Sequence, residues 1–220
     1  MTLLAIALLL LPAAASGQLG ARSAKEWIER LDDPQRIAGL KIARVVAALK
    51  LKPGDVVADI GAGSGAFSLP FARAVAPGGK VYAVDIDQEL LDHIAAKARR
   101  EGVENIQTIR GESTDPRLPA RDVDLAFFHD VLHHIEKRQP YLKTLAGYLK
   151  PGARVAVIEM NPHDPKSAHR RHGPEMLLEK KQVTKWLEEI GFHPVEEFDL
   201  YGEAKWFIVY SRRPQASDAR

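Results

Sequence analysis

Apolar runs alternate with amphipathic stretches along most of this chain. Five runs read as buried strands, at 56–60, 81–87, 106–112, 123–130 and 153–160. Apolar residues at helical spacing predict helices between and around them, at about 34–50, 66–76, 91–98, 142–149 and 183–190. Such alternation predicts right-handed βαβ units and a mainly parallel sheet. The final strands, 193–200 and 205–211, have no helix between them, so we expect a hairpin and one antiparallel sheet edge.

Length and charge narrow the class of protein. The chain has 220 residues, of which 45% are hydrophobic, enough for one buried core and one domain, expected at 21–213. The 31 basic and 29 acidic residues nearly balance, so we expect no nucleic-acid partner. The sequence contains no Cys, which excludes disulfides and thiolate chemistry. The last residues, 214–220, read as a solvated tail.

The first 17 residues differ from the rest. An apolar run from Leu3 to Leu11 is followed by Pro12 and by Ala13-Ala14-Ala15, which fits a small-x-small cleavage rule, although no Lys or Arg precedes the run. This pattern is typical of a secretory signal peptide. We therefore expect an exported protein, periplasmic or secreted, with no stable membrane span after cleavage. If the signal is not used, the protein is cytoplasmic.

The segment "VVADIGAGSGAFSLPFA" (56–72) carries the main functional signal. Gly61, Gly63 and Gly65 separate a predicted strand from a predicted helix, so the backbone can approach a ligand closely. Asp85 ends the next strand, at the same sheet edge, where its carboxylate can bind ribose hydroxyls. NAD and S-adenosylmethionine (SAM) both suit this pairing. Asp59 favours SAM, because it can accept a hydrogen bond from the cofactor's ammonium group, which a dinucleotide lacks at that place.

Four segments together resemble the class I SAM-dependent methyltransferases of the small-molecule, UbiE-like (type 11) kind. They are "VVADIGAGSG", "VYAVDID", "VDLAFFHDVLHHI" and "LKPGARVAVIE", and the resemblance covers residues 34–211. It implies an α/β, Rossmann-like, doubly wound sheet of seven strands in the order 3-2-1-4-5-7-6, with strand 7 antiparallel. The hairpin expected from the pattern agrees with this topology.

The resemblance also implies SAM as cofactor and assigns its contacts. The first acid and the glycine loop take the methionine end, the second acid takes the ribose, its neighbour packs on the adenine, and a third acid touches the adenine amino group. In this sequence those residues are Asp59, Gly61, Ala62, Gly63, Gly65, Asp85, Ile86 and Glu112. Glu112 stands where the family more often has Asp.

The exit of the fourth strand supplies the candidates for chemistry. His129, Asp130 and His133 follow the apolar run "LAFF", where the family places residues that face the methyl acceptor. Methyl transfer from a sulfonium needs mainly alignment, and a base only where the acceptor must lose a proton. A histidine is a plausible base, and packing or capping is the plain alternative for it. His134 shares this position, and helical geometry would turn only one of the two adjacent histidines toward the cleft.

The expected function is methyl transfer from SAM to a small-molecule acceptor. Two alternatives stay open: a non-catalytic SAM-binding protein, and an NAD(P)-dependent Rossmann oxidoreductase. His169, His172 and Glu175 lie in a polar stretch after the fifth strand; we expect an acceptor-binding or lid loop there and no metal site. The sequence does not predict the acceptor or the oligomeric state.

Overall fold

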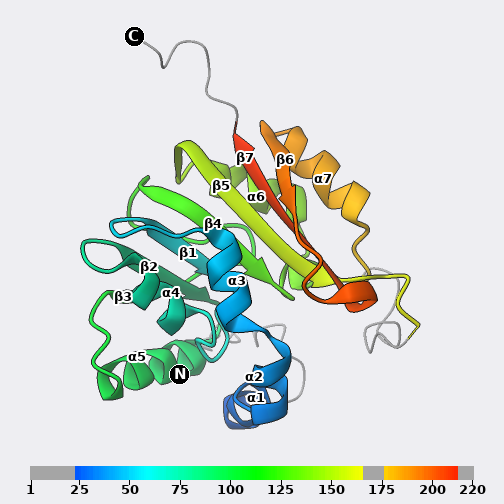
Figure 1. The fold of residues 1–220 in the computed structure, drawn as a ribbon. Helices are drawn as coiled ribbons and strands as arrows, with labels where there is room; N and C mark the ends of the chain where they lie inside the picture. Colours follow the sequence, from blue (N-terminus) through cyan, green and yellow to red (C-terminus); the bar gives the residue numbers. More distant parts are fainter. Residues whose placement is uncertain (1–22, 166–175, 213–220) are drawn as a thin grey trace, which may run out of the picture.

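A seven-stranded sheet forms the centre of the computed structural model, which describes residues 23–165 and 176–212. The strand order is β3-β2-β1-β4-β5-β7-β6 (Figure 1). The strands are β1 (Val56–Ile60), β2 (Lys80–Asp85), β3 (Ile106–Arg110), β4 (Val123–His129), β5 (Leu149–Met160), β6 (Phe192–Glu197) and β7 (Lys205–Arg212). The pairs among β1 to β5 are parallel, and β7 runs antiparallel to both β5 and β6. The predicted fold class, including the antiparallel strand, is confirmed.

Helices cover both faces of this sheet. They are α1 (Ala24–Leu31), α2 (Pro34–Gly39), α3 (Ile42–Leu49), α4 (Ser68–Val75), α5 (Gln88–Arg100), α6 (Arg138–Ala146) and α7 (Lys180–Glu188). Figure 1 shows α3, α4 and α5 on one face and α6 and α7 on the other. A short 3₁₀ turn, Leu132–His134, follows β4, and another, Gly202–Ala204, precedes β7.

The core consists of an apolar layer on each side of the sheet. Successive side chains of a strand point to opposite faces, so Val57 packs with α3 and α4 whereas Ala58 packs toward α6 and α7. All five residues of β1 are buried, as expected for the central strand of a parallel sheet. Burial on both faces fixes where β1 ends, and with it the position of the glycine loop.

Several element boundaries differ from the sequence-based expectation, and three of them involve a cap, a helix break or an extended strand. The helix predicted at 34–50 breaks between α2 and α3, where Lys41 has φ 51° and donates from Nζ to the Leu200 carbonyl. Helix α1 was not predicted, although Ser23 and Glu26 form a capping box at its start. β5 begins at Leu149, four residues before the expected start. In each case tertiary pairing or a cap outweighs the local apolar period.

Some expectations fall on residues that the structure does not describe. They concern the signal peptide at 1–17, the tail at 214–220, and the candidates His169, His172 and Glu175. Within the described ranges, 23–165 and 176–212, none of the helices has both the length and the apolar character that a bilayer span needs.

Candidate functional site

The glycine loop leaves β1 with its backbone close to two other elements. Gly61, Gly63 and Gly65 have φ of 68°, 56° and 77°, the left-handed region that favours glycine. A Cβ on Gly61 would lie 2.1 Å from Val131 Cγ2, and one on Gly63 would lie 3.1 Å from Leu31 Cδ1. A side chain at Gly61 would therefore need either the loop or the exit of β4 to move.

Asp85 joins this loop to the end of β2. Its Oδ2 accepts a hydrogen bond from the Gly63 N–H at 2.9 Å, and its Oδ1 accepts one from the Asp87 N–H at 3.1 Å. Burial raises the pKa of the Asp85 carboxyl, and the N–H groups of Asp87, Gly63 and Ile86 partly oppose this rise. The two motifs that the sequence predicted to meet are thus in direct contact.

Asp59 lies under the loop, on β1, and is 3% exposed. Its Oδ2 accepts a hydrogen bond from the Ser68 hydroxyl at 2.6 Å. Burial raises the pKa of the Asp59 carboxyl to about 7, the Ser68 bond lowers it, and nearby Asp85 raises it further. A buried acid of this kind is stabilised as a carboxylate when a cation approaches, so the residues present suit a ligand that carries an ammonium group.

The other predicted cofactor residues lie at the ends of β2 and β3. Ala62 donates its N–H to the Val84 carbonyl at 2.9 Å, and Gly111 donates its N–H to the Asp85 carbonyl at 2.9 Å. Ile86 is half-buried beside Asp85. Glu112 is exposed and forms an ion pair with Arg117. The structure therefore brings all of these residues to one sheet edge, with the Glu112 carboxylate held by Arg117.

His129 ends β4 with its imidazole ring inside an aromatic cluster. The side chain is 5% exposed, and its ring centroid lies 5.0 Å from that of Phe67. Burial, with Lys205 and Arg36 nearby, lowers the pKa of His129 to about 3, whereas Asp130 raises it. His129 is therefore a neutral imidazole at physiological pH and a much weaker base than a solvated histidine.

Asp130 turns the chain out of the sheet with φ 52°. Its Oδ2 accepts a hydrogen bond from Lys205 Nζ at the start of β7. Burial raises the pKa of the Asp130 carboxyl, but the charge and hydrogen bond of the Lys205 ammonium group oppose this rise, so the net pKa is lowered and Asp130 is a carboxylate. The exit of β4 thus carries a buried ion pair beside the glycine loop.

His133 and His134 have different surroundings. The His133 side chain is 0% exposed, and its Nδ1 lies 2.7 Å from Glu159 Oε2 on β5, while its backbone N–H donates to Glu159 Oε1 at 3.3 Å. His134 is exposed, with its ring centroid 4.1 Å from that of His133. Arg138 donates to the His133 carbonyl at 2.6 Å. This places His133 as a support of the turn after β4, on the α6 and α7 side of the sheet.

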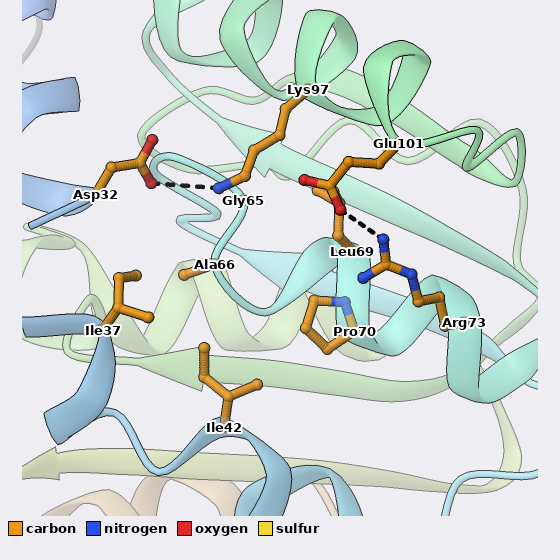
Figure 2. Close-up of a pocket in the computed structure, with 10 residues that line it drawn as sticks. All are labelled: Asp32, Ile37, Ile42, Gly65, Ala66, Leu69, Pro70, Arg73, Lys97 and Glu101. Carbon is orange, nitrogen blue, oxygen red and sulfur yellow. Dashed lines mark hydrogen bonds and ion pairs between the residues drawn. The ribbon is translucent and has the colours of Figure 1, made fainter. Parts of the chain in front are cut away.

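A cavity of about 380 Å³ lies on the outer side of the glycine loop (Figure 2). Its wall is partly apolar, with Leu69 and Pro70 of α4 facing Ile37 and Ile42. Figure 2 shows its four charged residues in two pairs, Asp32 with Lys97 and Arg73 with Glu101. Since the charges that line this cavity are already paired with one another, the described residues offer no free charge there for a polar cofactor. Asp59 and Asp85 remain the acids near the glycine loop that suit such a ligand.

Sequence reasoning missed three charged residues around the site. Lys205 pairs with Asp130, Arg36 donates to the Leu31 carbonyl at 2.9 Å, and Asp32 contacts His93 Nε2 at 2.9 Å on α5. Lys205 is the first residue of the strand predicted at 205–211, and this position is the signal by which it could have been found. Arg36 lies in α2 and Asp32 caps the end of α1, and only the tertiary structure shows that both residues lie near the site.

Comparisons with known proteins agree with this geometry. A family model described as a methyltransferase domain matches residues 57–152. A 2-phytyl-1,4-naphtoquinone methyltransferase of Synechococcus elongatus is 32% identical over 130 residues, covering 59% of this chain and 55% of that enzyme. The chain spans about half the length, or less, of the curated relatives that it matches.

Two solved structures show the same fold. A SAM-dependent methyltransferase from Aquifex aeolicus has a TM-score of 0.76 at 24% identity, covering 87% of this chain and 100% of that chain. A Bordetella parapertussis protein described as a possible exported protein has a TM-score of 0.64 at 20% identity, covering 82% of this chain and 68% of that chain. The matched methyltransferase domain, the sheet topology and the joined glycine and acidic motifs thus agree with the class I SAM-dependent methyltransferases that the sequence resembles.

Proposed function

We propose that this protein transfers a methyl group from SAM to a small-molecule acceptor. The observation that carries the proposal is the contact between Asp85 and the glycine loop, with the buried acid Asp59 beneath it. The loop excludes side chains, one neighbouring acid suits a ribose, and the other suits an ammonium group. Together these features match the nucleoside and methionine parts of SAM. A dinucleotide would leave Asp59 without a cationic partner.

In this proposal the chain's residues bind and align the reactants. The bound cofactor supplies an activated methyl group. Asp85 accepts hydrogen bonds from ribose hydroxyls with the lone pairs that its two backbone contacts leave, and Asp59 becomes a carboxylate facing the ammonium group. Alignment of nucleophile and methyl group is worth up to ~7–11 kcal/mol in favourable intramolecular systems. Positioning can therefore provide most of the acceleration without a strong base.

The names of the curated relatives and the low net charge of the chain both favour a small-molecule acceptor. The matched curated enzymes include a naphtoquinone methyltransferase and a nocamycin O-methyltransferase. The net charge of +2 gives no field of the size that nucleic-acid binding uses, although a ribosomal RNA methyltransferase is also among the relatives. We propose a small organic acceptor and no nucleic acid; a non-catalytic SAM-binding role is the main competing function.

Export is a separate part of the proposal. It rests on the apolar run followed by Ala13-Ala14-Ala15, and a structural relative is itself described as a possible exported protein. Amino-terminal sequencing of the protein isolated from its host should begin between residues 16 and 18, in a fraction outside the cytoplasm. A native protein that starts at Met1 or Thr2 in the cytosol would contradict export and leave the enzymatic proposal intact.

The enzymatic proposal is tested with SAM labelled in its methyl group. The protein is incubated with this SAM and a small-molecule extract of its host, and label in the extract is counted after protein and nucleic acid are removed. We expect label transfer by the wild type and at least tenfold less by Asp85→Asn. Asp122→Asn is the matched control, since Asp122 pairs with Lys80 at the amino end of the sheet. Binding of S-adenosylhomocysteine without any transfer would favour the non-catalytic alternative.

A further inference from the structure

Lys205 connects the exit of β4 to the last strand of the sheet. Its ammonium group donates to Asp130 Oδ2 and also lies 3.4 Å from His129 Nε2. The Lys205 and Asp130 side chains are 15% and 18% exposed, so most of the pair is shielded from water. An ion pair in such surroundings constrains both partners more strongly than a surface pair does.

The same contact determines the tautomer of His129. An ammonium group only donates hydrogen bonds, so the His129 Nε2 that faces it must offer its lone pair. The imidazole is neutral, and its proton then sits on Nδ1, which lies 3.5 Å from Asp130 Oδ2. Neither ring nitrogen is therefore available to take a proton from an acceptor. This argues against the general-base role that the sequence suggested for His129.

Asp130 keeps one oxygen outside this arrangement. Among the described residues, its Oδ1 has no hydrogen-bond partner although it is shielded from solvent. A buried carboxylate oxygen without a partner is costly, and such an atom often marks a place where a ligand donates a hydrogen bond. Lys205 also lines an open cavity of about 540 Å³ with Asn161, Phe198 and Trp206, so the β7 side of the pair has room for a small molecule.

We propose that Lys205 is a positioning residue that holds Asp130 so that Oδ1 accepts a hydrogen bond from the O–H or N–H group of a neutral methyl acceptor. This inference rests on the proposed function and names its substrate class. Lys205 and Arg36 bring two positive charges near one carboxylate, which disfavours an acceptor that is itself a cation. As the new bond to the methyl carbon forms, the carbon–sulfur electron pair stays on sulfur, and the acceptor's proton moves to Asp130 Oδ1 and then to water.

The charged and titratable groups around the pair are few and come from several elements. His129 ends β4 and Asp130 follows it, Lys205 begins β7, Tyr201 approaches from the loop before β7, and Arg36 acts from α2. His133 contributes a further electrostatic effect on Asp130. Lys205 is the member of this set that contacts both His129 and Asp130 from outside β4, which makes it the residue to change.

The test reads the His129 tautomer by nitrogen-15 NMR at neutral pH, with S-adenosylhomocysteine binding measured on the same samples. We expect His129 to carry its proton on Nδ1 in the wild type and to gain a substantial Nε2–H population in Lys205→Met. Lys205→Arg should restore the wild-type tautomer. Lys180→Met is the matched control, because Lys180 lines the same cavity but pairs with Glu197. S-adenosylhomocysteine affinity should change less than threefold in every variant.

A second measurement adds the acceptor. Single-turnover transfer from labelled SAM to 1,4-naphthohydroquinone, a neutral hydroxyl probe, should fall at least tenfold in Lys205→Met, and n-butylamine should not be methylated. A wild-type His129 protonated on Nε2, or a tautomer unchanged by Lys205→Met, would overturn the inference even if the probe is not methylated. Failure of every variant and of the wild type to bind S-adenosylhomocysteine would instead overturn the proposed function.

Discussion

At the scale of single residues, Asp59 shows how the fold changes the chemistry of an ordinary side chain. The sequence marks it as an acid before a glycine loop, and the structure removes it from water on a central strand. Its carboxyl then titrates near neutrality, with a pKa of about 7. The sequence predicted where Asp59 lies but not this property, because desolvation depends on the layers packed over β1.

The raised pKa of Asp59 predicts a pH-dependent stability. Between the unfolded value of 3.8 and the folded value of about 7, the folded state binds more protons, so the free energy of unfolding falls as pH rises through this window. Asp59→Asn removes this titration. We expect the variant to gain about 2–3 kcal/mol relative to wild type between pH 5 and pH 8. Urea unfolding at both values measures the gain, and an equal effect of the substitution at both would contradict it.

Gly61 provides a second test at this scale. Alanine there needs a positive φ and meets Val131 Cγ2 at 2.1 Å, whereas alanine at Gly102 needs φ 63° but meets nothing within 4 Å. We expect Gly61→Ala to lower the free energy of unfolding by ~2–4 kcal/mol, from backbone strain plus overpacking. Gly102→Ala should cost only the strain, ~1 kcal/mol. Equal losses in denaturant unfolding would show that Val131 yields without cost.

At the scale of elements, the turn after β4 depends on a buried contact between His133 and Glu159. Removing the imidazole leaves the Glu159 carboxylate buried with fewer partners, which costs ~3–5 kcal/mol in comparable buried pairs. We expect His133→Ala to lower the unfolding midpoint strongly while the protein that remains folded still binds S-adenosylhomocysteine. His134→Ala, at the exposed neighbour, is the control and should change little. Lost binding with unchanged stability would instead place His133 in the ligand site.

Helices α1 and α2 lie over the glycine loop and are fixed to α5 by Asp32. Its carboxylate lies 2.9 Å from His93 Nε2 and 3.3 Å from Lys97 Nζ. We expect Asp32→Asn to speed amide hydrogen exchange in residues 24–39 several-fold while the strands keep their protection. Glu29→Gln, which removes an exposed pair with Lys25, should leave exchange unchanged. Uniform acceleration across the whole chain would indicate global destabilisation rather than release of these helices.

The same elements show what a sequence can predict. β1 and β2 are short apolar runs with an acid at or next to the end, so these runs predicted both strands and the loop between β1 and α4. The break at Lys41 was not predicted, because it depends on a long-range contact with Leu200. α1 was not predicted although its capping box is a local signal. At the exit of β4, the sequence named His129, Asp130 and His133 together. These residues have different partners in the structure: Asp130 pairs with Lys205 of β7, and His133 contacts Glu159 of β5.

At the scale of the whole molecule, the order of the strands makes a site of residues that are distant in sequence. β1 lies between β2 and β4, so the glycine loop has Asp85 on one side and the exit of β4 on the other. β7 brings Lys205 beside that exit from the far end of the chain. We therefore expect the cofactor at this edge of the sheet, whereas the acceptor should depend on the residues that this chain adds around it.

The central claim, that this fold binds SAM and not a dinucleotide, is tested most directly by calorimetric titration of the full chain with S-adenosylhomocysteine and, separately, with NADH. Asp59 and Asp85 together suit a ligand with both an ammonium group and a ribose. We predict saturable binding of one S-adenosylhomocysteine per chain, weakened at least tenfold by Asp85→Asn, and no binding heat from NADH. Saturable NADH binding with none for S-adenosylhomocysteine would contradict the account.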